Sequence, residues 1–488
     1  MRINRRFLPA LGGISLALIA SSSPVLGEEL KVTESQGVNL TIYNQNFGLV
    51  KDIRNVDLKD GINYLRFEDV AAQIDPTSVS FQSLTAPNAV VVREQNYQYD
   101  LMDPTTILSK STGKTLKFRQ YMDNGSVREF SGTLLNSPRS VVADTTGSTS
   151  TRYQGLVVKS GDGVILNPQG EIELAALPEG LVSKPSLFWK LEASKGGQHR
   201  TEIAYQTQGI NWRCDYVAVM NKDDNQLDLT SWVTLDNKAG ASFKNAALKL
   251  LAGDVHRVQT QNYPAAGAVF RAKAERMDSQ FKEQSFAEYH LYTLQGKTDV
   301  LDNETKQVSL FAADKIPARK LFVYEPEAQS FLYWEGRSSS QKVNVKIEVE
   351  NSQKNGLGMP MPKGKVRVYK KDADGALQFI GEDMIDHTPR DEKIRLYIGD
   401  AFDVVAERKQ MQQQQISDRV QRMTYEISVR NHKDCPIAVN CVEHCFGDWT
   451  ILNSSLPYTK KDSRSFEFVP QVPPNGEVKV TYTVEVRY

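Results

Sequence analysis

Hydrophobic and polar residues alternate strictly at several places along the chain, and the longest alternation lies at the C-terminus. Its apolar positions are Val478, Val480, Tyr482, Val484, Val486 and Tyr488. The same period of two recurs at residues 343–349 and 38–42. This period buries one face of a strand and leaves the other in water, as in antiparallel sheets. The pattern therefore predicts strands over most of the chain.

Turn signals separate the alternating segments, for example Asp60-Gly61, Asp374-Gly375 and Asn475-Gly476. Strands and helices do not alternate in the rhythm that a parallel α/β sheet requires. We therefore predict an all-β fold of antiparallel sandwich-like domains. Two polar stretches of helix-forming residues, 265–283 and 401–422, are predicted to be short helical connectors over the sheets.

Residues 105–180 differ from their surroundings because glycines interrupt very short apolar runs, a pattern that suits a small inserted β-barrel. At 488 residues the chain has room for several domains. The predicted divisions are a signal peptide at 1–27, an N-terminal β-sandwich-like domain at 28–104, a small β-barrel-like insertion at 105–180, a β-rich domain with a helical connector at 181–300 and a C-terminal β-sandwich-like domain at 301–488.

The N-terminus has the features of a secretory signal. Arg2, Arg5 and Arg6 precede an apolar run, and small residues follow near Gly27. The run is shorter than a membrane span, and no later stretch approaches roughly 18 consecutive apolar residues. We expect an exported protein without a transmembrane segment, periplasmic or extracellular, whose mature form begins at Glu28.

Composition narrows the possible partners and chemistries. Lysine plus arginine and aspartate plus glutamate both number 59, and this balance argues against a nucleic-acid partner. The mature chain contains no Gly-x-Ser-x-Gly, no phosphate-binding Gly-x-x-x-x-Gly-Lys and no His-Glu-x-x-His. No cofactor is predicted, and an enzyme is less expected than a binding protein. The expected partner is an envelope protein or glycan, and the oligomeric state stays open.

Three of the four cysteines, Cys435, Cys441 and Cys445, lie close to His432 and His444. Their spacing does not match zinc knuckles, so no metal site is predicted. Residues 437–446 are expected to form a strand, in which Cys441 and Cys445 share a face about 13 Å apart. A disulfide needs Cα atoms within about 7 Å, so this pair is not expected to bond. Buried free thiols and one long-range disulfide both remain open.

The densest acidic stretch contains Asp383, Asp386 and His387. Two carboxylates beside an imidazole could serve as an acid/base cluster for hydrolysis or as a calcium site. The alternative is a set of solvated strand edges and turns. A hydrolase would require these groups to converge in a cleft within hydrogen-bond reach.

A segment at residues 355–365 combines strand breakers with apolar side chains. Leu357, Met359 and Met361 lie between glycines and prolines that prevent regular pairing. If these side chains are exposed, they form a candidate partner-binding loop. If they fold back, the flexible methionines fill a gap between domains.

Several longer segments resemble one bacterial family. They are Gly358–Tyr369, Phe379–Asp383, Asp386–Pro389, Gly399–Asp403, Asn431–Lys433 and Gly447–Trp449, with Trp232 and Asn237. They are similar to the domain-of-unknown-function family numbered four-one-three-nine, which is related to mucoidy-inhibitor-like proteins. The resemblance covers about residues 190–488. It implies a β-rich, exported envelope protein of bacteria, with no catalytic residues to assign.

From the residues and this resemblance we expect an exported cell-envelope binding or scaffold protein of unknown ligand. A hydrolase of envelope polymers that uses carboxylates and His387 is the alternative.

Overall fold

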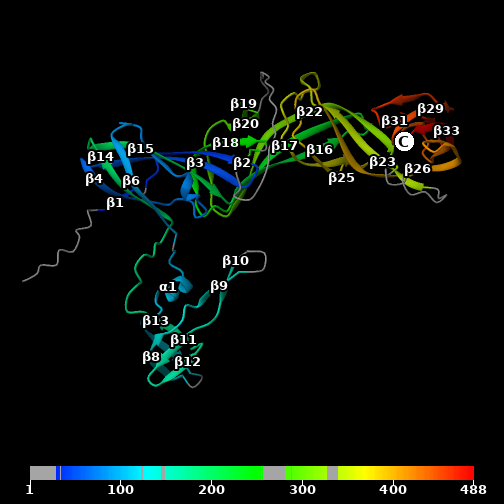
Figure 1. Ribbon diagram of the computed structural model, residues 1–488. Coiled ribbons are helices and arrows are strands. Elements are labelled where there is room, and N and C mark those ends of the chain that lie inside the picture. The colour runs from blue at the N-terminus through cyan, green and yellow to red at the C-terminus, as the bar shows by residue number, and fades with distance from the viewer. Residues whose placement is uncertain are drawn as a thin grey trace, which may run out of the picture. The chain divides into compact units, whose positions relative to one another are not determined.

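The computed structural model describes residues 29–32, 34–99, 101–122, 125–143, 149–253, 255–256, 281–286, 288–326 and 339–487. Within these residues nearly every element is a β-strand, and the one α-helix is α1 (Pro104–Lys110) (Figure 1). The predicted all-β fold is confirmed. The predicted signal peptide at 1–27 lies outside the described residues. Among them, no helix is both long and apolar enough to cross a membrane.

The described residues form two compact units. The first contains the described residues up to Glu34 together with Arg54–Val70 and Phe81–Thr201. The second contains Ser35–Ile53, Ala71–Ser80 and the chain from Glu202 onward.

A four-stranded sheet belongs to the first unit. Its order is β1 (Glu29–Val32), β4 (Gly61–Glu68), β14 (Ser186–Ala193) and β6 (Val90–Gln98). Leu65, Phe67, Leu187, Trp189 and Leu191 alternate along β4 and β14 and are buried. This burial on alternate positions is the physical basis of the period of two in the sequence.

The insertion is an open sheet, so the predicted barrel is wrong. Its strand order is β12 (Gly163–Leu166), β11 (Val157–Ser160), β8 (Val127–Leu134), β7 (Thr115–Tyr121) and β13 (Glu171–Glu173). No pairing between the outer strands β12 and β13 closes this sheet in the described residues. A separate hairpin pairs β9 (Arg139–Ala143) with β10 (Thr149–Tyr153).

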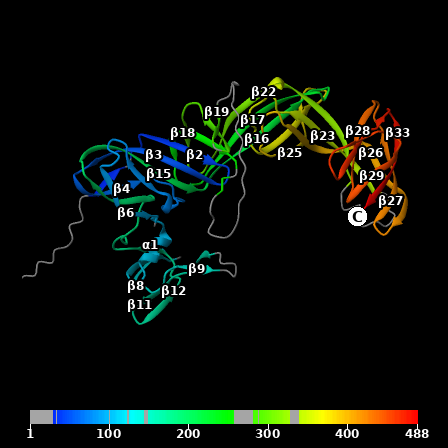
Figure 2. The same cartoon turned by 45° about the horizontal axis from the view of Figure 1, so that its top comes forward.

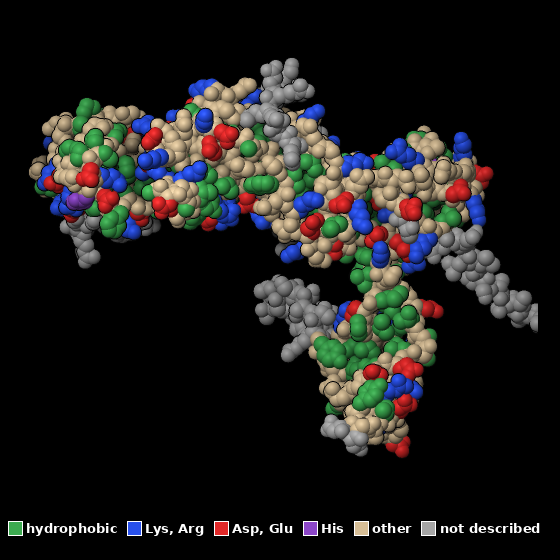
Figure 3. Space-filling view, turned by 180° about the vertical axis from the view of Figure 1, so that it is seen from behind, with side chains coloured by type: hydrophobic (Ala, Val, Ile, Leu, Met, Phe, Trp, Pro, Cys, Tyr) green, Lys and Arg blue, Asp and Glu red, His purple; other side chains and the backbone are tan. Residues whose placement is uncertain are grey.

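The inserted sheet has a small core of its own. Its buried side chains are Leu116, Phe118, Leu134, Leu156 and Val158. So few strands cannot bury all of their apolar residues, and several remain on the surface, where Figure 3 shows hydrophobic side chains gathered. The most exposed of them are Tyr121, Tyr153, Val164, Leu166 and Leu177.

An eight-stranded sheet contains β19 (Phe281–Phe286), β20 (Tyr289–Leu294), β18 (Phe243–Ala252), β2 (Gly37–Tyr43), β3 (Phe47–Leu58), β15 (Gly197–Gln208) and β5 (Ser80–Ser83) in that order, and β21 (Thr298–Val300) also pairs with β18. The helical stretch predicted at 265–283 lies outside the described residues except for its last three, which begin β19.

The largest sheet has fourteen strands. Its main order is β25 (Leu377–Ile385), β24 (Gly364–Lys371), β16 (Ile210–Met220), β17 (Gln226–Asn237), β22 (Glu304–Tyr324), β23 (Ser339–Glu350), β26 (Lys393–Ser417), β27 (Val420–Asn431), β33 (Gly476–Arg487) and β29 (Asp448–Ser454). Attached to it are β28 (Ile437–His444), β30 (Tyr458–Lys460), β31 (Ser465–Phe468) and β32 (Gln471–Val472).

This sheet curls until its edge strand β25 lies against β26. The backbone N–H of Tyr397 donates to the carboxylate of Asp383 over 2.7 Å. At Gly381 an added Cβ would lie 2.3 Å from the carbonyl oxygen of Ile398, so only glycine permits this approach. Figure 1 shows β16, β17, β22 and β25 grouped in the curled part.

The C-terminal strands form a second hydrophobic core, which includes Val404 and Ala406 of β26. Side chains from β26, β27, β28, β31 and β33 enclose it, and Figure 2 shows β26, β27, β28 and β33 lying together. The core is rich in aromatic rings, with Phe466, Phe468 and Tyr482 in mutual edge or tilted contact.

The predicted helix at 401–422 is wrong, because this stretch belongs to the hairpin of β26 and β27. Gln412 to Gln415 are exposed and pair in register with residues 421–424. The hairpin continues two strands whose inner ends are anchored in the core at Ala406 and Ile427. That anchoring outweighs the local helix preference of the glutamines.

Three buried asparagines, Asn237, Asn351 and Asn431, end or directly follow β17, β23 and β27. In each, the side-chain Nδ2 reaches three backbone carbonyls, and Oδ1 accepts one backbone N–H. The next strand then pairs in parallel with an earlier one: β18 with β2, β24 with β16 and β28 with β22. The same strand–asparagine–strand unit therefore occurs three times.

Candidate functional site

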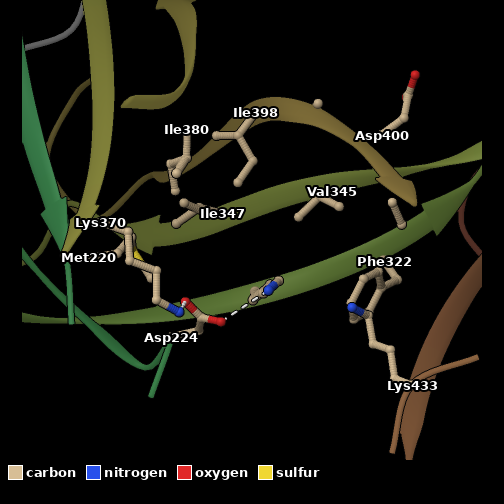
Figure 4. Close-up of a pocket in the computed structure, with 13 residues that line it drawn as sticks. Met220, Asp224, Phe322, Val345, Ile347, Lys370, Ile380, Ile398, Asp400 and Lys433 are labelled. Carbon is tan, nitrogen blue, oxygen red and sulfur yellow. Dashed lines mark hydrogen bonds and ion pairs between the residues drawn. The ribbon is translucent and has the colours of Figure 1, made fainter. Parts of the chain in front are cut away.

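A groove opens at the rim of the curled sheet, in the second unit, with a volume of about 250 Å³. Side chains from β16, β22, β23, β24, β25 and β26 line it together with two loop residues (Figure 4). The lining residues are Met220, Asp224, Lys320, Phe322, Val345, Ile347, Lys370, Ile380, Ile398, Gly399, Asp400, Ala401 and Lys433.

The floor of the groove is apolar. Ile347 and Met220 are buried, and Phe322 and Val345 are half-buried beside them. Val345 and Ile347 share one face of β23 because a single residue separates them along the strand. The floor is thus a continuation of the sheet's core that the chain does not cover completely.

Ile380 of β25 and Ile398 of β26 form the opposite wall, and Figure 4 shows them facing Val345 and Ile347 across the opening. The close approach at Gly381 brings their strands together. The register between β23 and β26 shifts twice here. At one shift the single residue Val343 of β23 lies opposite the four residues 401–404 of β26, which form a bulge. Such bulges redirect side chains, and here they hold the rim of the groove open.

One end of the groove carries a cluster of three charges. Asp224 accepts hydrogen bonds from Lys370 over 2.5 Å and from Lys320 over 3.0 Å. Burial alone would raise the pKa of Asp224, but the hydrogen bonds and positive charges of the two lysines hold that pKa below its ordinary value. Asp224 is therefore ionised at neutral pH, and the cluster has a net charge of one positive unit.

A side-chain network in the turn between β16 and β17 places Asp224. Oδ1 of Asn221 accepts the backbone N–H groups of Asn225 and Gln226. Asp224 itself has a φ of 57°, a left-handed conformation that aspartate and asparagine tolerate better than most residues. The turn therefore presents the carboxylate to lysines from two different strands, β22 and β24.

The other end of the groove carries Lys433 and Asp400. Lys433 lies 3.4 Å from Asp403 and stands beside Phe322 in Figure 4. Asp400 is held by the side chains of Asn344, Tyr397 and Lys342, of which the Asn344 hydrogen bond contributes most to its lowered pKa. Next to it, Phe402 is 95% exposed on the bulge of β26.

The groove combines an apolar floor with aspartates and lysines at its ends. Its lining residues include no serine, threonine, cysteine, tyrosine or histidine. An apolar slot with a few charged groups at its ends is suited to hold a small molecule that has an apolar part.

The acid/base candidates Asp383, Asp386 and His387 take separate partners. Asp383 accepts backbone N–H groups of Met384 and Tyr397. Asp386 is mostly exposed and pairs with Lys363 over 3.1 Å. The Nδ1 of His387 accepts the backbone N–H of Lys363 over 3.1 Å. These contacts fit the alternative of solvated turns and strand edges.

The other ring nitrogen of His387 lies 3.3 Å from Nδ2 of Asn44, while the buried Oδ1 of Asn44 has no hydrogen-bond partner. Because Nδ1 already accepts a hydrogen bond, Nε2 carries the proton in the neutral ring. Turning the Asn44 amide by 180° lets Oδ1 accept that proton. His387 then acts as a structural link in its loop.

The partner-binding candidates Leu357, Met359 and Met361 belong to a packed loop. Leu357 and Met361 are only 3% and 2% exposed, and Met359 is half-buried. Buried tyrosine hydroxyls also fix the backbone, because Tyr292 donates to the carbonyl of Pro360 and Tyr216 to that of Pro362. The burial favours the alternative in which these side chains fill a gap, and no contact with a partner is shown.

All four cysteines are free, and Cys214, Cys441 and Cys445 are buried while Cys435 is exposed. The predicted strand is present as β28, and the expectation that Cys441 and Cys445 do not bond is confirmed. In the part of the chain that is described, no three His, Cys, Asp or Glu side chains are grouped to hold a metal ion.

A serine–histidine contact, which the sequence does not indicate, lies in the first unit. The Oγ of Ser83 is 2.9 Å from Nδ1 of His199, whose Nε2–H donates a hydrogen bond to the carbonyl of Lys195. Ser83 and His199 are 1% and 2% exposed, so no substrate reaches them. The serine also accepts the backbone N–H of Ala86, as in a turn. We assign this pair a structural role.

Sequence reasoning missed the groove, although a signal was present. Segments Phe379–Asp383, Gly399–Asp403 and Asn431–Lys433, which carry the family resemblance, each contribute lining residues. They are far apart in sequence: the pairing of β26 with β27 brings the last two together, and the curling of the sheet adds the first.

The fold and the groove define an all-β protein with a ligand-sized site at the rim of a curled sheet. The chain belongs to the family described as Domain of unknown function (DUF4139), whose model matches residues 201–488. All residues that line the groove fall within the matched range. Among curated proteins, none matches this chain.

Proposed function

We propose that this protein is a binding protein of the cell envelope that holds the apolar part of a small ligand in the groove. The observation that carries the proposal is the uncovered apolar floor of the groove in the curled sheet. A covered core would leave no such volume, since protein interiors are close-packed. The place of action outside the cytoplasm rests on the signal-like N-terminus, and it stays a prediction.

The size of the groove limits the affinity. Each methylene group buried contributes about 0.8 kcal/mol, so four or five of them supply roughly 3–4 kcal/mol. This corresponds to a dissociation constant of about 1 mM, which a polar contact would improve. A weak, reversible binder is therefore expected, and hydrolysis by Asp383, Asp386 and His387 has no comparable support.

The test uses 1-octanol, which is neutral and has one flexible chain, with binding followed by saturation-transfer NMR. The Ile380→Trp variant should fill the groove and abolish binding. Leu377→Trp is the matched control, since Leu377 lies on the same strand but is 53% exposed and does not line the groove. Equal binding of octanol to both variants, or none to the unaltered protein, would reject the proposal.

A further inference from the structure

The charged side chains at the ends of the groove indicate which sign of charge its ligand carries. Three lysines and two aspartates are among the lining residues, which leaves one net positive charge. Both aspartates are already engaged, Asp224 with two lysines and Asp400 with Asn344, Tyr397 and Lys342. A cationic ligand would have to compete with these internal partners.

At the Asp224 end of the groove, the two lysines have more N–H donors than Asp224 uses. Each ammonium group has three N–H donors, and the bond to Asp224 uses one of those on Lys320 and one on Lys370. The two side chains are 34% and 29% exposed, and both line the groove. An anion placed there meets two partly desolvated ammonium groups held in position by a single carboxylate.

We infer that the ligand is a single-chain amphiphile with an anionic head, whose chain lies on Ile347, Val345 and Phe322 and whose head meets Lys320 and Lys370. This inference rests on the proposed function, because it needs the groove to be occupied at all. Both lysines line the groove together with the apolar floor, and Figure 4 shows Lys370 and Asp224 at one end of that floor, as a chain and its head group require.

A matched eight-carbon series tests the charge: octanoate, 1-octanol and octyltrimethylammonium, titrated into the full chain at low salt. Octanoate should bind about fivefold more tightly than octanol, as expected for one partly exposed ion pair. The ammonium compound should bind more weakly than octanol.

Lys370→Gln should remove the advantage of octanoate over octanol when both are measured on the same variant, and the circular dichroism spectrum of the variant should match that of the unaltered protein. Lys354→Gln is the control, because Lys354 has a comparable pair with Glu350 and does not line the groove. It should leave all three affinities unchanged.

The outcomes separate the two claims. If octanol binds but octanoate has no advantage, or if Lys370→Gln does not change that advantage, the inference is wrong and the groove is simply apolar. If no compound binds to the unaltered protein, both the inference and the proposed function fail.

Discussion

At the scale of single residues, burial determines which of the potentially reactive side chains a reagent or substrate can reach. Burial raises the pKa of the Cys214 thiol to about 11 and that of Cys445 to about 12, and it raises the pKa of Cys441 as well. Cys435 is exposed. Nucleophilicity requires the thiolate, so three of the four thiols are inert in the folded protein.

We expect iodoacetamide at pH 8 to label only Cys435 in the folded protein and all four cysteines in denaturant. The buried thiols stay protonated at this pH because their pKa values lie well above it, and they are also out of reach of the reagent. Peptide mass mapping after a short exposure measures the sites. Labelling of Cys441 or Cys445 without denaturant would mean that the core around β28 opens readily.

At the scale of elements, the strands depend on a few buried polar anchors. Asn351 is fully buried, and its amide joins the end of β23 to the loop before β24 and to residue 389. Leaving several buried backbone groups without partners costs about 1–3 kcal/mol for each group. Asn351 therefore stabilises the loop that contains Leu357 and Met361.

Asn351→Ala should lower the free energy of unfolding by about 3 kcal/mol, because the partly buried carbonyls of Met359 and Pro389 and the N–H of Gly358 lose their side-chain partner. Asn453→Ala, at an exposed position of β29, should change it by less than about 0.5 kcal/mol. Urea denaturation followed by circular dichroism measures both. Equal effects for the two variants would contradict the anchoring role.

Strand positions could be predicted from the sequence where burial alternates, as in β23 and β33. Alternation says nothing about the bulge at residues 401–404, where polar and apolar residues are mixed and the register to β23 shifts. It also failed for the β26–β27 hairpin, whose exposed glutamines have no buried face to impose a period. The methionine loop was open to two interpretations because only packing distinguishes a filled gap from an exposed patch.

At the scale of the whole molecule, the chain combines three copies of the strand–asparagine–strand unit with one inserted sheet. The core of the insertion is made of its own residues, between Leu116 and Val158. The chain enters and leaves it at neighbouring points, since the N–H of Met102 donates to the carbonyl of Val182. The small barrel that the glycines suggested is an open sheet, because glycine spacing marks turns but not closure.

Replacing residues 105–180 by a short Gly/Ser linker should leave the rest of the protein folded. The ends already lie together, so the linker adds little closure entropy. The circular dichroism spectrum should keep its β signal, and the thermal transition of the remainder should stay cooperative. A general loss of secondary structure would show that the insertion is needed for the other sheets.

The groove depends on features at every scale: the lysines set its charge, the bulge of β26 shapes its rim, and the curling of the sheet brings its walls together. Its most direct test is an NMR titration with octanoate on protein that carries labelled isoleucine methyl groups. We predict saturable shifts for Ile347, Ile380 and Ile398, and none for the exposed Ile62 or the buried Ile203. Shifts confined to other isoleucines, or the absence of any saturable shift, would contradict the account.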